Sequence, residues 1–131
     1  LDHIASTDFD DAHTLLTAFT LLDAVSAERD VSELFNKLAQ ALPSASHFIR
    51  DLPITGYGLT PLAFAPAPDA YCRPLFDDAL IAAHLDALAA QQQADGGWPI
   101  AWEPPSPAAV LEWRAQRTVS ALRTLRAYGR I

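Results

Sequence analysis

The sequence predicts an all-α fold, in which antiparallel helical hairpins form a single domain over residues 1–131. Three observations support this prediction. Apolar residues recur at spacings of three and four over four segments, a pattern typical of the buried face of a helix. Residues that cap helices precede these segments, and proline or glycine follows them. Half of the residues are hydrophobic, so the chain can bury a sizeable core.

The first hairpin is expected before residue 43. Its first helix should cover residues 8–27, with Ser6 or Thr7 as the cap. The apolar face of that helix comprises Leu15, Phe19, Leu22 and Val25. Its second helix should follow the cap Asp30 and end at Pro43, because proline cannot continue a helix.

The segment over residues 43–76 is the least regular part of the chain. Prolines and glycines interrupt it, so we expect a bridging segment with a short helix over residues 44–50. Loops of this length are often functional, or they pack across one end of a fold. A third helix should run from residue 75 or 77 to residue 93. A fourth should start at its cap Ser106 and stop at Gly129.

The stretch from Gln91 to Pro99 joins the third and fourth helices. Its sequence is Gln-Gln-Gln-Ala-Asp-Gly-Gly-Trp-Pro. Gly96 and Gly97 can adopt the positive φ values that reverse the chain after a helix. Gln92 can hydrogen-bond to backbone groups that are free at the helix end. We expect Trp98 to pack beneath the following helix, because its ring favours burial.

The residues from Gln92 to Trp98 fit Q-x-x-D-G-G-W, which resembles the QW motif of the terpenoid cyclase and protein prenyltransferase superfamily. The resemblance continues into the last helix and covers roughly residues 80–131. It implies an α/α toroid, a ring of repeated helical hairpins. A closed ring of six hairpins, at ~40 residues each, needs roughly twice this length. We therefore expect a partial α/α toroid that belongs to a longer protein, also because the chain contains no methionine.

A partial ring leaves apolar helix faces uncovered, and such faces attract partners. We expect either the missing remainder of the toroid or a second copy, in a homo-oligomer, to cover them. The net charge of −7 argues against nucleic acid as a partner. Five arginines follow residue 102, and they should pair with acids on neighbouring helices or, in a sharper interpretation, bind an anion.

The single cysteine, Cys72, permits no intramolecular disulfide, which fits a cytoplasmic location. No apolar run approaches the ~18 residues of a membrane span. The cysteine and the four histidines contain no close pair such as H-x-x-x-H, so we predict no metal site and no cofactor. His13, beside Asp10 and Asp11, could bind a divalent ion, but a solvated first helical turn is the preferred interpretation.

The candidate catalytic residues are Asp8, Asp10 and Asp11, which fit D-x-D-D. This pattern resembles the motif of class II terpene cyclases. The resemblance implies that Asp10 is a general acid that protonates a double bond or an epoxide, and that Asp8 and Asp11 tune it. Neighbouring carboxylates raise the pKa of one member by repulsion, which keeps it protonated. In the alternative interpretation, all three are first-turn acids that complement the helix dipole.

Tyr57 and Trp102 on loops, and Trp113 on the last helix, are the candidate substrate-binding residues. Three functions remain open. The first is a terpenoid cyclase-like or prenyltransferase-like domain that acts on or binds an isoprenoid-like apolar molecule. The second is a non-catalytic helical module for interaction or dimerisation. The third is a carbohydrate-handling α/α toroid, because Asp-Gly-Gly-Trp-Pro also occurs in polysaccharide lyases.

Overall fold

The computed structural model describes residues 1–131 and confirms the all-α prediction. The elements are α1 (Asp2–Ser6), α2 (Ala12–Val25), α3 (Ser32–Ala41), η1 (Leu42–Ser44), α4 (Pro61–Phe64), η2 (Arg73–Leu75), α5 (Asp78–Ala90) and α6 (Pro107–Ala127). The backbone forms only two isolated β-bridges, between Asp11 and Ser46 and between Phe48 and Leu59. None of the helices combines the length and the apolar character that crossing a membrane requires.

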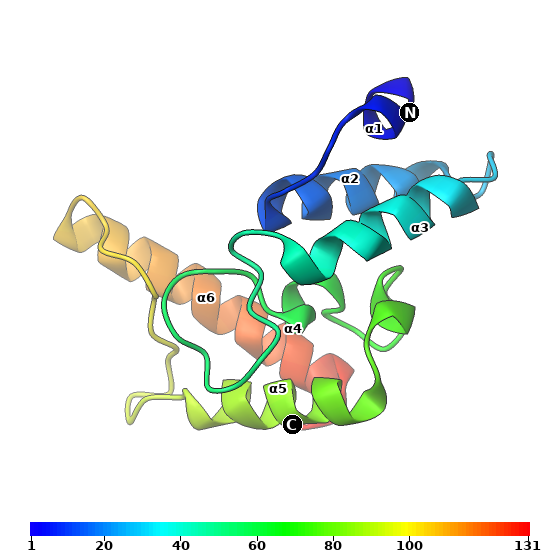
Figure 1. The fold of residues 1–131 in the computed structure, drawn as a ribbon. Helices are drawn as coiled ribbons and strands as arrows, with labels where there is room; N and C mark the ends of the chain where they lie inside the picture. Colours follow the sequence, from blue (N-terminus) through cyan, green and yellow to red (C-terminus); the bar gives the residue numbers. More distant parts are fainter.

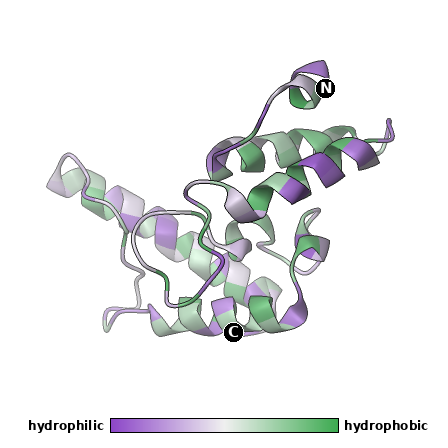
Figure 2. Cartoon of the chain, viewed as in Figure 1, coloured by the Kyte–Doolittle hydropathy of each residue, from purple (hydrophilic) through white to green (hydrophobic).

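The helices form two antiparallel pairs, α2 with α3 and α5 with α6, and α4 lies between the pairs (Figure 1). α1 projects from the first pair, and the first turns of α6 extend beyond the rest of the fold. The longer helices carry both hydrophobic and hydrophilic residues (Figure 2). Their buried residues recur at spacings of three and four, which places them on one face of each helix. Phe64 joins the pairs, because its ring lies 6.2 Å from that of Phe19 on α2 and 6.4 Å from that of Phe76 before α5.

Several helix boundaries differ from the prediction. Val31 rather than Asp30 precedes α3, helical turns continue through Pro43 in η1, and α5 ends at Ala90 rather than at residue 93.

The start of the first long helix also differs, because neither Ser6 nor Thr7 caps it. Residues 2–6 form α1, and α2 begins at Ala12 because Asp11 is the residue that caps it. The carboxylate of Asp11 accepts hydrogen bonds from the backbone N–H groups of His13 and Thr14. The short helix predicted over residues 44–50 is absent. The backbone there is held in bridges to two other segments, which prevents a helical turn.

The corner between α5 and α6 has most of its predicted features. Trp98 is 1% exposed, and its indole N–H donates a hydrogen bond of 2.7 Å to the carbonyl oxygen of Leu88. Gly96 has a φ of 85°, and the Gln92 amide donates to its carbonyl oxygen at 2.9 Å. The expectation of a positive φ at Gly97 is wrong. A Cβ atom there would lie 2.7 Å from the end of the flexible Arg114 side chain, which can move aside, so neither φ nor close packing requires a glycine at this position.

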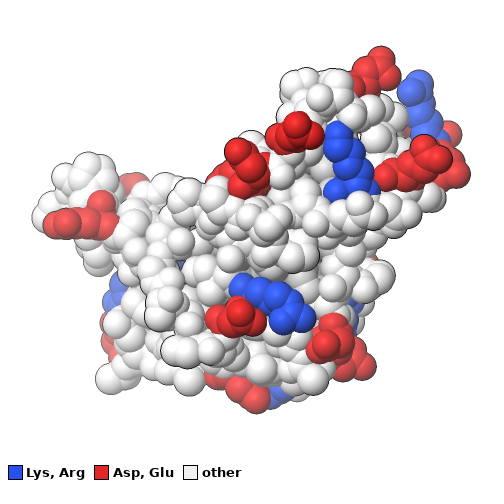
Figure 3. Space-filling view, in the orientation of Figure 1, with Lys and Arg blue, Asp and Glu red and all other residues white.

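Two arginines of the last segment pair with acids as predicted. Arg114 donates to Asp95 at 2.6 Å and holds the pKa of that carboxyl at about 2, and Arg130 donates to Asp86 at 2.6 Å. Arg117, in contrast, forms no ion pair. Burial lowers the pKa of its guanidinium. Its side chain and that of His84 line a cavity of about 350 Å³. On the face shown in Figure 3, acidic and basic groups are scattered and form no continuous basic patch.

Candidate functional site

Three side chains that could share a ligand or a metal ion meet at the start of α2. They are Asp11, His13 and His47, which we call the Asp11–His13–His47 cluster. Nδ1 of His47 lies 2.7 Å from Oδ2 of Asp11, and Nδ1 of His13 lies 3.3 Å from Oδ1. One potential ligand atom from each residue lies within 4.8 Å of the other two. The cluster therefore combines one carboxylate with two imidazoles at a partly exposed position.

Backbone bonds between two distant segments bring His47 to α2. Ser46 donates its N–H to the carbonyl oxygen of Asp10 at 2.7 Å, and Ala12 donates to the carbonyl oxygen of Ser46 at 2.9 Å. His47 itself has a φ of 57°, a conformation that is uncommon for residues other than glycine. Such conformations persist only where the surrounding structure holds them, and they concentrate at functional sites. The position of His47 is thus fixed by tertiary structure rather than by local preference.

The electrostatics of the cluster favour an ionised Asp11. The hydrogen bond from His47 lowers the pKa of Asp11 well below its ordinary value of 3.8, and bonds from His13, Thr14 and Ser46 act in the same direction. Partial desolvation opposes them but is outweighed. This direction is opposite to the one that a proton donor needs, and it also makes the carboxylate a weak base, so Asp11 is equipped to accept hydrogen bonds or to bind a cation.

Asp8 and Asp10 do not join Asp11 in a shared carboxylate site. Both side chains are exposed, and neither forms a hydrogen bond; only the backbone carbonyl of Asp10 does so, with Ser46. No neighbouring group therefore holds a proton in place on Asp10. The role of Asp10 as a general acid stays a prediction, whereas Asp11 is the member of the motif that the structure connects to other functional groups.

The lowered pKa of Asp11 predicts a pH-dependent effect of Asp11→Asn. Asparagine also caps helices, so the variant should fold, but it loses the charged acceptor of His47. Since the folded pKa is depressed, the stabilisation by the carboxylate is present above pH 3.8 and is lost as the pH falls further towards the folded value. Urea unfolding should show a less stable variant at pH 7 and a shrinking difference below pH 4. Asp10→Asn, the control, should match the wild type throughout.

An aromatic row continues from the cluster across the surface. The ring of His13 stacks on Tyr57, with centroids 5.6 Å apart and planes 12° apart, and Nε2 of His13 lies 2.9 Å from the Tyr57 hydroxyl. Trp102 meets Tyr57 edge to face at 6.1 Å and Trp113 at 5.3 Å. The three residues are 50%, 38% and 43% exposed, in the order Tyr57, Trp102, Trp113. The structure thus brings together the three predicted binding residues, which we call the aromatic row.

An apolar groove of about 380 Å³ lies next to His13, between α1 and α2. Its apolar walls come from Ile4, Phe9, Ala18 and Leu21, and His13 is also part of its lining. His13 therefore contacts both the groove and the aromatic row. The groove and the aromatic row both adjoin the polar cluster, an arrangement that suits a ligand with both a polar group and an extended apolar part.

The sequence analysis identified Asp11 and noted His13 but missed His47. Asp11 and His13 are two residues apart, whereas His47 comes from the irregular segment, and no spacing rule connects it to them. Another histidine, His84, is a core residue: it is 1% exposed, and its Nε2 donates to the carbonyl oxygen of Arg50 at 2.7 Å. Cys72 is also buried, and burial raises the pKa of its thiol to about 12, so it is not available as a thiolate ligand.

Comparisons with known proteins identify no relative. No protein-family model, no curated protein and no solved structure matches the chain. The functional interpretation therefore depends on the residues of the cluster, the aromatic row and the groove.

Proposed function

We propose that this chain is a partial α/α-toroid domain of the terpenoid cyclase and prenyltransferase type, which binds an elongated, isoprenoid-like apolar molecule. The molecule would lie along the groove between α1 and α2 and along the aromatic row, with its polar end at the Asp11–His13–His47 cluster. The observation that carries the proposal is the position of His13, which lines the groove and also stacks on Tyr57 of the aromatic row.

The corner between α5 and α6 supports the toroid part of the proposal. In the superfamily that this corner resembles, the glutamine, the glycines and the tryptophan of the QW motif join two helices of one hairpin. Here Gln92 donates to the backbone of Gly96, and Trp98 is buried with both of its N–H groups bonded, to Leu88 and to Thr118. The two antiparallel pairs in Figure 1 are hairpins of the kind from which such a ring is built.

The chemistry of the site supports binding in a particular orientation. A chain of carbon atoms gains free energy by covering exposed aromatic rings, at roughly 25 cal/mol per Å² of apolar surface removed from water. Tyr57, Trp102 and Trp113 offer such rings side by side. The ionised carboxylate of Asp11 and the two imidazoles can hydrogen-bond to a hydroxyl at the polar end of the ligand.

Titration with farnesol, an isoprenoid alcohol, tests this proposal. Trp102 and Trp113 are exposed, so their fluorescence should respond when the ligand covers them, whereas Trp98 is buried and should not. Trp102→Ala should weaken binding by about tenfold, the equivalent of 1.4 kcal/mol. Leu111→Ala is the control, because Leu111 is 68% exposed on α6 but lies outside the aromatic row, and it should bind as the wild type does.

A sugar ligand is the second candidate, because Tyr57 and Trp102 are both exposed and contact each other edge to face, so they offer aromatic rings on which a sugar can stack. Saturable binding of a cello-oligosaccharide, with no response to farnesol, would replace the isoprenoid by a carbohydrate.

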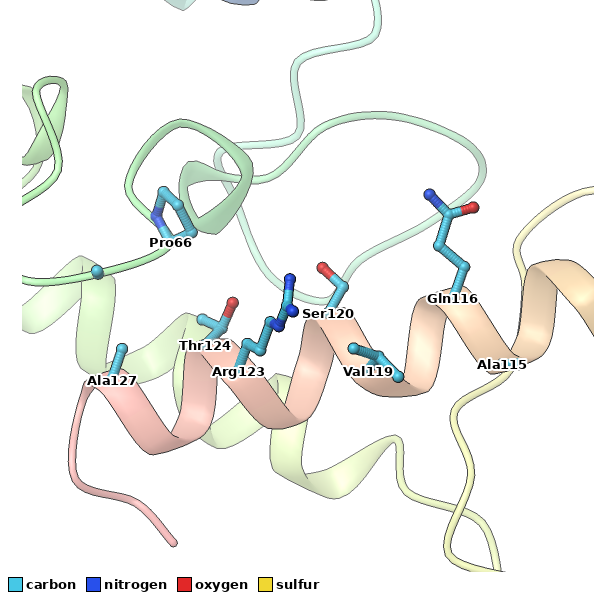
Figure 4. A pocket seen from close by; sticks show the side chains of 9 residues that line it. Pro66, Ala115, Gln116, Val119, Ser120, Arg123, Thr124 and Ala127 are labelled. Carbon is cyan, nitrogen blue, oxygen red and sulfur yellow. The ribbon is translucent and has the colours of Figure 1, made fainter.

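An interaction module is the third candidate, favoured by the outer face of α6. Figure 4 shows this helix beside a hollow of about 730 Å³ that includes Pro66, Val119 and Arg123, and Leu111, Val119 and Leu122 are exposed. This face could contact a second copy or the remainder of a toroid. A dimer in sedimentation that binds neither ligand would favour this function over the other two.

A further inference from the structure

We infer that Asp11, His13 and His47 form a site for one zinc ion, and that the Tyr57 hydroxyl orients the His13 ring through a hydrogen bond. This inference goes beyond the proposed function, because zinc binding requires no organic ligand. It also departs from the sequence, which predicts no metal site. The structure adds His47, whose imidazole lies within hydrogen-bonding distance of Asp11, the carboxylate that His13 also faces.

The set of donor atoms fits zinc better than magnesium or calcium. Imidazole nitrogen and carboxylate oxygen are the ligands of catalytic zinc sites, which use three protein ligands and keep a fourth position for water. Magnesium and calcium prefer oxygen ligands alone. The buried thiol of Cys72 cannot take the fourth position, so water or a ligand group would occupy it.

The distances require only a modest adjustment. Bonds of about 2.0–2.1 Å in a tetrahedron place neighbouring ligand atoms about 3.3 Å apart. In the structure the Nδ1 atom of His47 lies 2.7 Å from Oδ2 of Asp11 and would have to retreat by about half an ångström. The three potential ligand atoms lie within 4.8 Å of one another, so His13 would need only a small shift to reach the same spacing. Zinc would replace the proton on Nδ1 of His47, and this proton would leave to solvent.

The two oxygens of Asp11 allow capping and metal binding at the same time. Oδ1 accepts the N–H groups of His13 and Thr14 and thereby caps α2. Oδ2 accepts from His47 and from the Ser46 hydroxyl, and it is the oxygen that would bind zinc once the His47 proton is displaced. The helix therefore holds the carboxylate in a fixed orientation towards the ion.

His13 has the second contact that is typical of a metal-bound histidine. Such histidines almost always bond through their other ring nitrogen to a group that fixes the ring and its tautomer. Nε2 of His13 lies 2.9 Å from the Tyr57 hydroxyl, which can accept its N–H and leave the lone pair of Nδ1 free for zinc. Tyr57 also belongs to the aromatic row, so an occupied ion site would stiffen the surface proposed to bind the ligand.

Calorimetric titration of the full chain with zinc chloride, after removal of metal by a chelator, tests this inference. The wild type should bind one zinc ion per chain, and the tetrahedral cobalt(II) form should show visible absorption bands. Asp11→Asn and His47→Gln should each lower the affinity by more than about tenfold, and Tyr57→Phe, which keeps all three ligands, by about tenfold. His3→Gln is the matched control, since His3 contacts Thr7 and lies outside the cluster, and its affinity should be unchanged.

Circular dichroism establishes that each variant is folded before the titration. Absence of saturable one-to-one binding by the wild type would overturn the zinc site, and so would equal affinities for the wild type and His47→Gln. Unchanged affinity in Tyr57→Phe would overturn the orienting role of Tyr57. Because no organic ligand takes part, these results are separate from those of the farnesol titration.

Discussion

Replacement of Trp98 by alanine is expected to cost about 3–5 kcal/mol of the free energy of unfolding, the usual range for deleting a buried aromatic side chain. Trp98 is 1% exposed, and its indole N–H satisfies the carbonyl oxygen of Leu88 near the end of α5. The substitution leaves a cavity and frees that carbonyl. Domains of this kind have a total stability of about 5–15 kcal/mol, so urea unfolding followed by circular dichroism should show a large loss.

Trp113→Ala is the matched control, because it removes the same side chain from a site that is 43% exposed. The loss of its edge-to-face contact with Trp102 should cost about 0.5–1.5 kcal/mol, which is less than the loss expected for Trp98. The comparison therefore separates burial at the corner from the chemical identity of tryptophan. Equal losses for the two variants would show that Trp98 does not anchor α5 to α6.

The fold was predictable from the sequence wherever local signals sufficed. Ser106 caps α6 through the N–H of Ala109, and Gly129 ends the helix with a φ of 68°, both as predicted. The start of α2 was not, because Asp8, Asp10 and Asp11 are all acceptable caps by residue type. The helix begins after Asp11, because the backbone bonds of Asp10 and Ala12 to Ser46 keep the chain extended up to that residue, and only the Asp11 side chain then reaches the free N–H groups of His13 and Thr14.

The site was predictable only in part, for the same reason. Tyr57, Trp102 and Trp113 were expected as binding residues, but nothing in their spacing shows that they contact one another. The contact of Tyr57 with Trp102 depends on the path of residues 45–60 (Figure 1), which is set by bonds to α2 and by the packing of Phe48 on Phe64. No sequence rule predicts the path of a segment that lacks helical periodicity. The position of His47 was missed for this reason.

Gly58→Ala should disrupt the site through this same path. A methyl group at Gly58 would lie 2.7 Å from the carbonyl oxygen of His47 and 2.8 Å from the side chain of Ile49. That carbonyl oxygen also accepts the N–H of Leu59 at 2.7 Å, so it cannot move without breaking the contact between the two segments. We expect a loss of about 1–3 kcal/mol in urea unfolding, the range for overpacked positions. Displacement of His47 and Tyr57 should also weaken zinc and farnesol binding.

Gly56→Ala distinguishes this steric effect from the cost of replacing any glycine in the loop. Gly56 has a φ of 74°, and a methyl group there would have no neighbour within 4 Å. Its replacement should cost about 1 kcal/mol for the left-handed backbone but leave both binding properties in place. If Gly58→Ala also kept wild-type affinity for zinc and farnesol, the position of the loop would not control the site. Loss of both affinities in Gly58→Ala alone would instead show that one backbone contact, between Gly58 and His47, keeps the cluster beside the aromatic row.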